Sequence, residues 1–232
     1  MVLRTGHAWN LWVPHSCPWT PDRGPRDGQD SALPGGFRTT REDWHVSKSP
    51  RKRFRRFDTT ATAAERSATL RGDDLVSGAD VVMDRGFDLP VPPSEVWPWL
   101  VQLGKGRAGW YLPRRVERFV PRSRRAARRV LARWQDLGVG DVVPDYGGPR
   151  EYFEVAEILP PRVLVYRSRR GRTSLSWAIS LTQAEAGTRV HLRLRLGPVR
   201  RVRLAESVGG AFDALTVAGM AAGLRERLSS AS

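Results

Sequence analysis

The sequence has little cysteine, histidine and lysine, and the first two shortages exclude whole classes of site. A single cysteine, Cys17, among 232 residues excludes an intramolecular disulfide framework and any zinc site built from several cysteines. The four histidines are scattered, and three of them precede residue 46. We therefore expect no metal site in the folded part and no cofactor.

Long apolar runs are also missing. The longest apolar stretch, residues 211–224, contains Asp213 and several glycines and falls short of the roughly 20 apolar residues that span a bilayer. The first residues are interrupted by His7 and Pro14, so they lack the continuous apolar region of a secretion signal. We expect a cytoplasmic protein without a membrane span.

Familiar catalytic motifs are absent as well. The sequence has no G-x-S-x-G, P-loop, H-E-x-x-H or G-x-G-x-x-G pattern. His191, Asp145, Tyr146 and Glu154 could titrate, but none of them pairs with another at a telling spacing. These absences favour a binding protein over an enzyme.

Positive charge is abundant and unevenly placed. The chain has 39 Lys and Arg against 24 Asp and Glu, a formal charge of +15, and only three of these basic residues are Lys. Residues 105–133 hold eleven basic residues and one acidic residue, Glu117, and we expect Arg-rich helices there. The arginines that could contact an anionic surface are Arg114, Arg115, Arg118, Arg124, Arg125, Arg128 and Arg129.

Three interpretations of this segment remain open. It is a solvated face whose composition reflects GC-rich coding, a contact for anionic lipid headgroups, or a nucleic-acid contact. We rank nucleic acid last, because no helix-turn-helix or finger pattern is present and the aromatic residues follow core spacing.

The chain divides into two parts of different composition. Residues 1–69 are rich in Pro, Gly, Ser and Arg, show no sustained period, and include a polybasic run at 49–57. We expect a disordered basic N-terminal extension there, or a misassigned translation start, followed by a folded domain at 70–232. Truncation before residue 66 should leave the fold unchanged.

The folded part begins with one strand and one helix and continues mostly as strands. Residues 79–89 predict a strand, and a helix follows with Ser94 as its N-cap and Gly104 as its stop. Short strands are expected at 140–144, 151–158 and 162–168.

A hairpin gives the clearest pattern. Leu175, Trp177, Ile179 and Leu181 alternate with small residues, and after a turn Val190, Leu192, Leu194 and Leu196 alternate with Arg189, His191, Arg193 and Arg195. This period of two predicts an antiparallel hairpin with one buried face and one solvent-exposed face. Since His191 shares the arginine face, we expect it to point to solvent.

A C-terminal helix is expected at 204–228. Leu204, Val208, Phe212 and Leu215 recur at helical spacing, and many small residues follow them. A curved antiparallel sheet around one such helix can enclose an apolar ligand pocket.

Several stretches, in this order, resemble the START-like superfamily, and more closely its polyketide cyclase/dehydrase-like (SRPBCC) branch. They are LPVPPSEVWPWLVQLGKGRAGWY (89–111), WQDLGVGDVVPD (134–145), EILPPRVLVY (157–166), LSWAISL (175–181) and GTRVHLRLR (187–195). The resemblance implies an α+β helix-grip fold, a curved antiparallel sheet wrapped around a long C-terminal helix. It leaves function open, because the superfamily includes lipid carriers, hormone receptors and aromatase/cyclases.

The expected pocket would be lined mainly by aromatic residues. The candidates are Trp110, Tyr111, Tyr166, Trp177, Phe212, Leu215 and Met220. Aromatic walls suit a flat or apolar ligand, although the same residues could simply fill a core. We expect binding of a small hydrophobic, lipid- or polyketide-like ligand without covalent chemistry. An aromatase/cyclase-type enzyme is the alternative.

Overall fold

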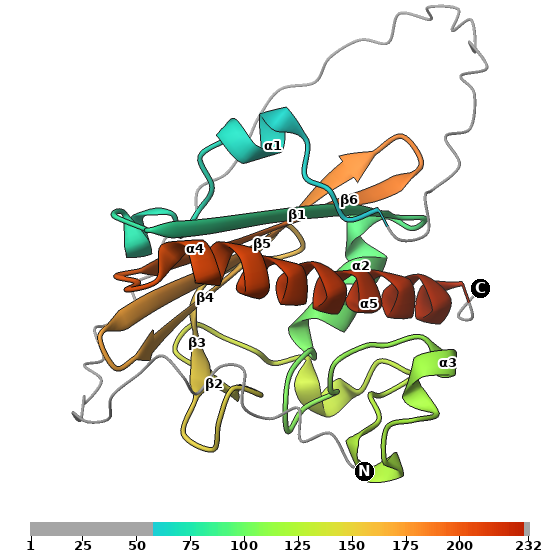
Figure 1. Cartoon of the computed structure of the whole chain (residues 1–232). Helices are drawn as coiled ribbons and strands as arrows, with labels where there is room; N and C mark the ends of the chain where they lie inside the picture. The colour runs from blue at the N-terminus through green and yellow to red at the C-terminus, as the bar shows by residue number, and fades with distance from the viewer. Residues whose placement is uncertain (1–57, 230–232) are drawn as a thin grey trace, which may run out of the picture. The chain divides into compact units, whose positions relative to one another are not determined.

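One six-stranded antiparallel sheet organises the part of the chain that the computed structural model describes, residues 58–229 (Figure 1). Across the sheet the strands are β1 (Val81–Leu89), β6 (Gly187–Gly197), β5 (Thr173–Ala184), β4 (Val163–Arg170), β3 (Tyr152–Leu159) and β2 (Val142–Pro144). The expected disorder of residues 1–57, including the polybasic run at 49–57, concerns residues outside the described part.

The β5–β6 hairpin follows the predicted register. Ala184 pairs with Gly187 at the turn, and Ile179 pairs with Leu192 farther along. Both of these apolar side chains are buried, as the period of two predicted. The face of the sheet that carries them is called the inner face below.

A long helix runs along the inner face beside β1 (Figure 1). It consists of α4 (Val202–Leu204), a π-helical turn (Ala205–Gly209) and α5 (Gly210–Leu228). Val217, Met220 and Leu224 are buried in the core. The α+β helix-grip architecture is therefore confirmed.

This helix is longer and more continuously apolar than the sequence suggested. By length and composition alone, Val202–Leu228 could cross a bilayer, which corrects the expectation drawn from residues 211–224. Core helices of soluble proteins meet the same criteria, and this helix carries buried residues against the sheet.

The face that the helix buries differs from the predicted one. Leu204, Val208, Phe212 and Leu215 are 43%, 59%, 43% and 72% exposed. Small residues pack inward instead, and a Cβ on Gly223 would stand 2.7 Å from the Tyr111 carbonyl carbon. Close approach of two backbones selects glycine at this position and decides how the helix is rotated.

The first helix begins before its predicted N-cap. Helix α2 spans Pro93–Val101 with Pro92, not Ser94, at its N-cap, and Pro98 lies inside it. Pro93 stands at the first helical position, where its missing N–H costs no hydrogen bond.

The expected Arg-rich helices do not form. Residues 105–133 contain only a four-residue helix, α3 (Arg114–Glu117), and a short 3₁₀ turn, η3 (Arg122–Arg124), with a second turn, η4 (Ala132–Trp134), at their end. Pro113 and Pro121 precede α3 and η3, and proline within this stretch prevents one longer helix. Residues 113–133 are called the basic lobe below.

The arginine face of the hairpin is covered rather than solvated. Residues 58–78, called the strap, lie on this outer face and contain helix α1 (Ala63–Ser67) and the 3₁₀ turn η2 (Asp74–Val76) (Figure 1). Thr60 bridges to Arg85 of β1, and Arg189 of β6 donates to both carboxylate oxygens of Glu65 at 2.7 and 2.8 Å. The fold therefore includes residues 58–69, which lie before the predicted boundary at residue 70.

His191 is buried under the strap, contrary to the prediction that it points to solvent. It is 6% exposed, and its Nε2 lies 2.7 Å from Asp84 Oδ1. Alternation placed it correctly on the arginine face, but the strap covers that face.

Candidate functional site

Four aromatic rings from different elements meet on the inner face. Phe153 of β3, Tyr166 of β4 and Trp177 of β5 have ring centroids 5.7 to 6.0 Å apart. Trp110, from the loop after α2, stacks on Trp177 at 6.1 Å. We call these four residues the aromatic stack.

Strand register and one hydrogen bond hold the stack in place. Tyr166 and Trp177 are direct partners across β4 and β5, so their rings project from the same face. Trp110 donates from Nε1 to the Thr216 carbonyl at 3.3 Å, which ties its loop to α5. The sheet, the loop and the helix therefore enclose the stack together.

Tyr166 gives the stack a buried polar group. The Tyr166 residue is 3% exposed, and its phenol belongs to the stack. Burial raises the pKa of this phenol above its ordinary range, and the nearby Arg107 charge only partly offsets that rise. Tyr166 is thus a neutral phenol at physiological pH.

Two more buried donors lie close together behind the α2 loop. Arg107 Nε and Trp134 Nε1 are buried and have no hydrogen-bond partner among the described residues. The Arg107 guanidinium stacks 4.7 Å from the centroid of the Trp134 ring and donates to the Trp134 carbonyl at 2.9 Å. Burial raises the pKa of both Tyr111 and Tyr166, and the Arg107 charge opposes this rise at each phenol. Arg107 therefore lies near both.

The sequence reasoning missed this donor group. Arg107 is only one of eleven basic residues in 105–133, and Trp134 stands out only as the first residue of the stretch 134–145. The only available signal was an arginine between two glycines, in GKGRAG, directly before the aromatic pair Trp110-Tyr111.

The predicted ligand residues divide into three groups. Trp110, Tyr166 and Trp177 come together in the aromatic stack. Tyr111 and Met220 are fully buried in the core, where the Tyr111 hydroxyl donates to the Trp99 carbonyl at 2.9 Å. Phe212 and Leu215, the remaining two, are exposed on the helix.

Three of the four titratable candidates, His191, Asp145 and Glu154, lie in ion pairs. His191 contacts Asp84 under the strap, on the other side of the sheet from the stack. Asp145 pairs with Arg170, and Glu154 with Arg167 at 2.5 Å. The Arg170 guanidinium that holds Asp145 lies 5.4 Å from the centroid of the Phe153 ring, so this ion pair borders the stack. The fourth candidate, Tyr146, contacts the Trp110 backbone, and burial raises the pKa of its phenol.

The basic lobe is joined to the end of α5 by a buried ion-pair network. Glu117 accepts from Arg227 at 2.5 Å and from Arg128 at 2.8 Å, and Arg128 also pairs with Glu226 at 2.6 Å. The Arg227 side chain is 0% exposed, and burial lowers its pKa against the opposing effect of Glu117. Arg128, a predicted surface contact, is instead committed to the two glutamates.

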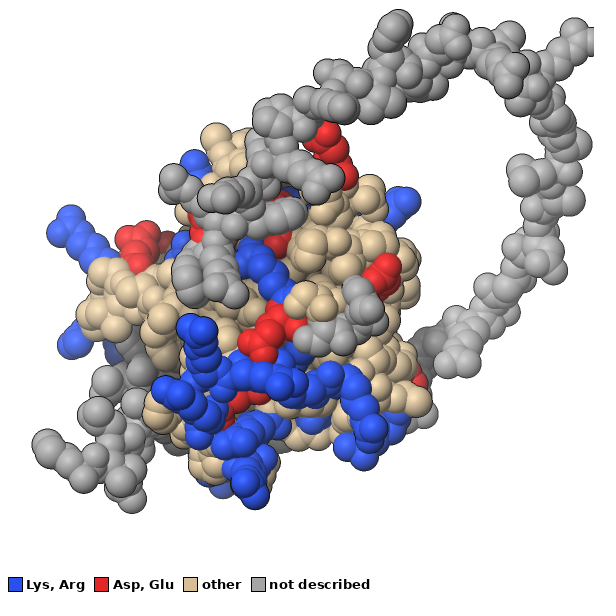
Figure 2. Space-filling model, turned by 90° about the vertical axis from the view of Figure 1, so that its right-hand side faces the viewer, with Lys and Arg blue, Asp and Glu red and all other residues tan. Residues whose placement is uncertain are grey.

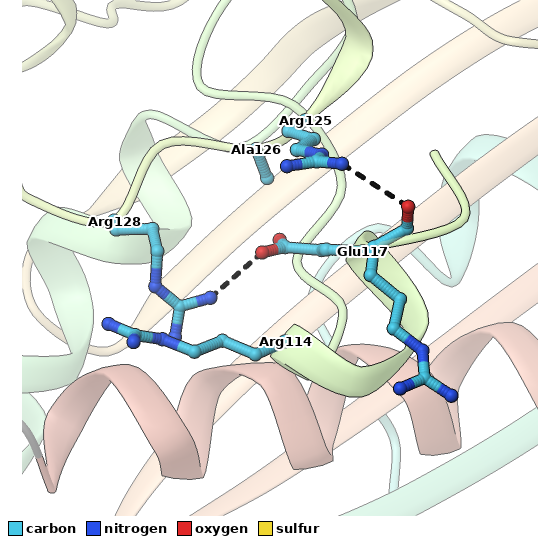
Figure 3. Close-up of a pocket in the computed structure, with 6 residues that line it drawn as sticks. Arg114, Glu117, Arg125, Ala126 and Arg128 are labelled. Atoms are coloured by element: carbon cyan, nitrogen blue, oxygen red, sulfur yellow. Dashed lines mark hydrogen bonds and ion pairs between the residues drawn. The ribbon is translucent and has the colours of Figure 1, made fainter. Parts of the chain in front are cut away.

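A cavity of about 370 Å³ opens beside this network (Figure 3). It is lined by Arg114, Glu117, Arg118, Arg125, Ala126 and Arg128. Figure 3 shows Glu117 directed toward Arg128, while Arg125 donates to the Arg118 carbonyl. Four arginines against one neutralised carboxylate make this cavity suited to an anion.

Comparison with known proteins finds similarity in structure alone. No family model matches the sequence, and no curated protein sequence matches it. Among solved structures, CV1439 from Chromobacterium violaceum is 14% identical with a TM-score of 0.41, covering 62% of this chain and 95% of that chain. CalU16 from Micromonospora echinospora is 18% identical with a TM-score of 0.36, covering 60% of this chain and 72% of that chain.

A third similar structure is DynU16, a protein of the dynemicin biosynthetic locus. It is 16% identical with a TM-score of 0.39, covering 65% of this chain and 48% of that chain. Similarity at this level carries no argument about ligand or activity.

Proposed function

We propose that the protein binds a small, largely apolar ligand beside the aromatic stack, without covalent chemistry. The ligand is lipid- or polyketide-like and carries at least one acceptor oxygen. The observation that carries this proposal is the aromatic stack together with two nearby buried donors, Arg107 Nε and Trp134 Nε1, which have no hydrogen-bond partner among the described residues. A buried donor left unpaired costs about 1–3 kcal/mol, and a ligand carbonyl or hydroxyl would remove that cost.

The surroundings of Tyr166 support the same ligand chemistry. Stacked rings offer flat apolar area that loses little side-chain entropy on binding. The unpaired donors of Arg107 and Trp134 favour an oxygen-bearing group as well. We also propose that the chain is a member of the START-like superfamily, in its SRPBCC branch, and the helix-grip architecture supports this assignment.

Binding is proposed in preference to catalysis. A cyclase needs an acid or base that faces its substrate, and His191, Asp145 and Glu154 are held in the contacts described above.

The test is a ligand screen followed by one conservative substitution. Native mass spectrometry and thermal shift with fatty acids and aromatic polyketides should identify a binder that raises the melting temperature. Tyr166→Phe should then weaken that binder about 5- to 30-fold, since it removes one hydrogen bond from a buried site. The stability of the free protein should change little, because the substitution keeps the aromatic ring in the stack.

Tyr152→Phe is the matched control, because Tyr152 is a half-exposed tyrosine on β3. Its affinity for the same ligand should equal that of the wild type. Failure of every ligand in both classes, or unchanged affinity in Tyr166→Phe, would contradict the proposal.

A further inference from the structure

An exposed aromatic ring lies in the middle of the basic lobe. Phe119, directly after α3, is 77% exposed, and its neighbour Val116 is 46% exposed. The Arg118 guanidinium lies 4.7 Å from the centroid of the Phe119 ring. A phenylalanine this open contributes little to the core, so its apolar surface is available to a partner.

Exposed arginines surround this apolar pair. They are Arg114, Arg115, Arg118, Arg122, Arg124, Arg125, Arg129 and Arg133. The lobe's one acidic residue, Glu117, is buried and already neutralised by Arg128 and Arg227. The outward charge of the lobe is therefore uncompensated within it, and Figure 2 shows Lys and Arg gathered on the side of the molecule that carries α3.

We propose that the basic lobe docks the protein onto an anionic phospholipid bilayer. Phe119 and Val116 enter the interfacial region, and the surrounding arginines contact lipid phosphates. The two features suit one partner, because a bilayer surface presents negative charge above an apolar layer. Arginine can pair with phosphate through two parallel hydrogen bonds, which a lone positive charge cannot do.

The arginine-lined cavity fits the same partner. Arg118 lines the cavity and also stacks on Phe119, so the cavity opens beside the inserting ring. A phosphate headgroup there would meet Arg114, Arg118 and Arg125, none of which pairs with the buried Glu117 in the described structure. Headgroup contact and ring insertion could therefore occur together.

A nucleic acid is the less suitable partner. Single strands are bound through several aromatic rings that stack successive bases, and the lobe exposes one phenylalanine. Duplex recognition would leave Phe119 and Val116 without a role. This docking surface includes none of the four rings of the aromatic stack, so either proposal can fail without the other.

The test measures flotation of the full chain with vesicles of phosphatidylcholine, with and without phosphatidylglycerol. We expect binding only to the anionic vesicles, weakening as salt rises. Phe119→Asp should reduce partitioning about tenfold or more. Arg115→Glu combined with Arg118→Glu and Arg122→Glu should reduce it at least about a hundredfold.

Matched controls lie outside the lobe, in the middle of the long helix and at its N-terminal end. Leu215→Asp changes an equally exposed apolar residue, and Arg200→Glu with Arg201→Glu and Arg203→Glu changes three exposed arginines. Both controls should bind anionic vesicles within about twofold of the wild type. The whole series is repeated with the basic residues of 49–57 replaced by Gln, because that run could attract vesicles by charge alone.

Insertion is measured separately from attraction. In a Cys17→Ser background, a dye on Phe119→Cys should shift its emission to the blue on anionic vesicles, whereas the same dye on Leu215→Cys should not. The proposal is overturned if the wild type ignores anionic vesicles or if the control variants lose as much binding as the lobe variants. Binding of duplex DNA that depends on the lobe arginines, without vesicle binding, would also overturn it.

Discussion

Arg193 should be the residue on which attachment of the strap depends most. Its side chain is 4% exposed and donates to Asp84 at 2.8 Å and to Asp73 at 2.9 Å. It also donates to three strap carbonyls, of Glu65, Arg66 and Ala68, at 2.7 to 3.0 Å. Arg193→Met keeps most of the side-chain volume but removes every one of these hydrogen bonds.

The loss should be large because the partners stay buried. Removing one member of a buried ion pair costs about 3–5 kcal/mol, and we expect the free energy of unfolding to fall by that amount. Urea unfolding followed by circular dichroism measures it, and amide hydrogen exchange should show loss of protection in α1. Arg193→Lys keeps the charge but lacks the planar set of donors, so its free energy of unfolding should lie between those of the wild type and Arg193→Met.

Arg195→Met is the control on the same face. Its side chain is 16% exposed, donates to the Val76 and Ser77 carbonyls at 3.1 and 3.2 Å, and lies 3.8 Å from Asp73. We therefore expect a loss of about 1–2 kcal/mol. If Arg193→Met unfolds within 1 kcal/mol of the wild type, or no more easily than Arg195→Met, then Arg193 does not hold the strap.

Three further predictions concern packing, pH and the domain boundary. Gly223→Ala should lower the free energy of unfolding, measured in urea, by about 1–3 kcal/mol, because its Cβ would clash with the Tyr111 backbone. An unchanged urea midpoint would show that the loop at Tyr111 moves aside at no cost in stability. Burial tends to raise the pKa of Glu65, but hydrogen bonds and charge from Arg189 prevail and lower it from 4.5 to about 2. The contribution of Glu65 to the free energy of unfolding is therefore complete above its unfolded pKa and is lost as the pH falls toward 2. Because the pair with Arg189 is partly open to solvent, we expect a loss of about 1–2 kcal/mol. Acid titration of the wild type should show this loss, and acid titration of Glu65→Gln should not. A chain that starts at residue 70 should melt at a lower temperature than one that starts at residue 58, and equal melting temperatures would restore the boundary predicted from the sequence.

The strands and the fold class could be predicted because their signal is local. Alternation in residues 175–181 and 190–196 follows directly from the pleat, and one apolar face suffices to fix the register. The same pattern could not show that the polar face is covered. Arginine at every second position of a strand predicts a solvent-exposed face. The strap that covers this face shows no periodic pattern in its sequence.

The predictions for the C-terminal helix and for the basic lobe were wrong for a different reason. The stripe from Leu204 to Leu215 predicts a buried face, but the close fit of Gly223 against the Tyr111 loop turns the helix another way. In the lobe, Pro113 and Pro121 outweigh a composition that otherwise favours helix.

The candidate site was predicted in part. Trp110, Tyr166 and Trp177 meet as a set, because strand register brings two of them together. Phe153 was not among the predicted ligand residues, and the unpaired donors of Arg107 and Trp134 depend on loop geometry that no spacing reveals.

Three of the five groups that accept hydrogen bonds from Arg193 are main-chain oxygens, which every amino acid possesses. Exchanging Arg66 or Ala68 for other residues would leave those acceptors in place, provided that the helical turn persists. Apart from Glu65, whose carboxylate pairs with Arg189, the amino acids of α1 are thus free to diverge while the outer covering of the sheet endures, so chains alike in shape could differ at most positions of this segment.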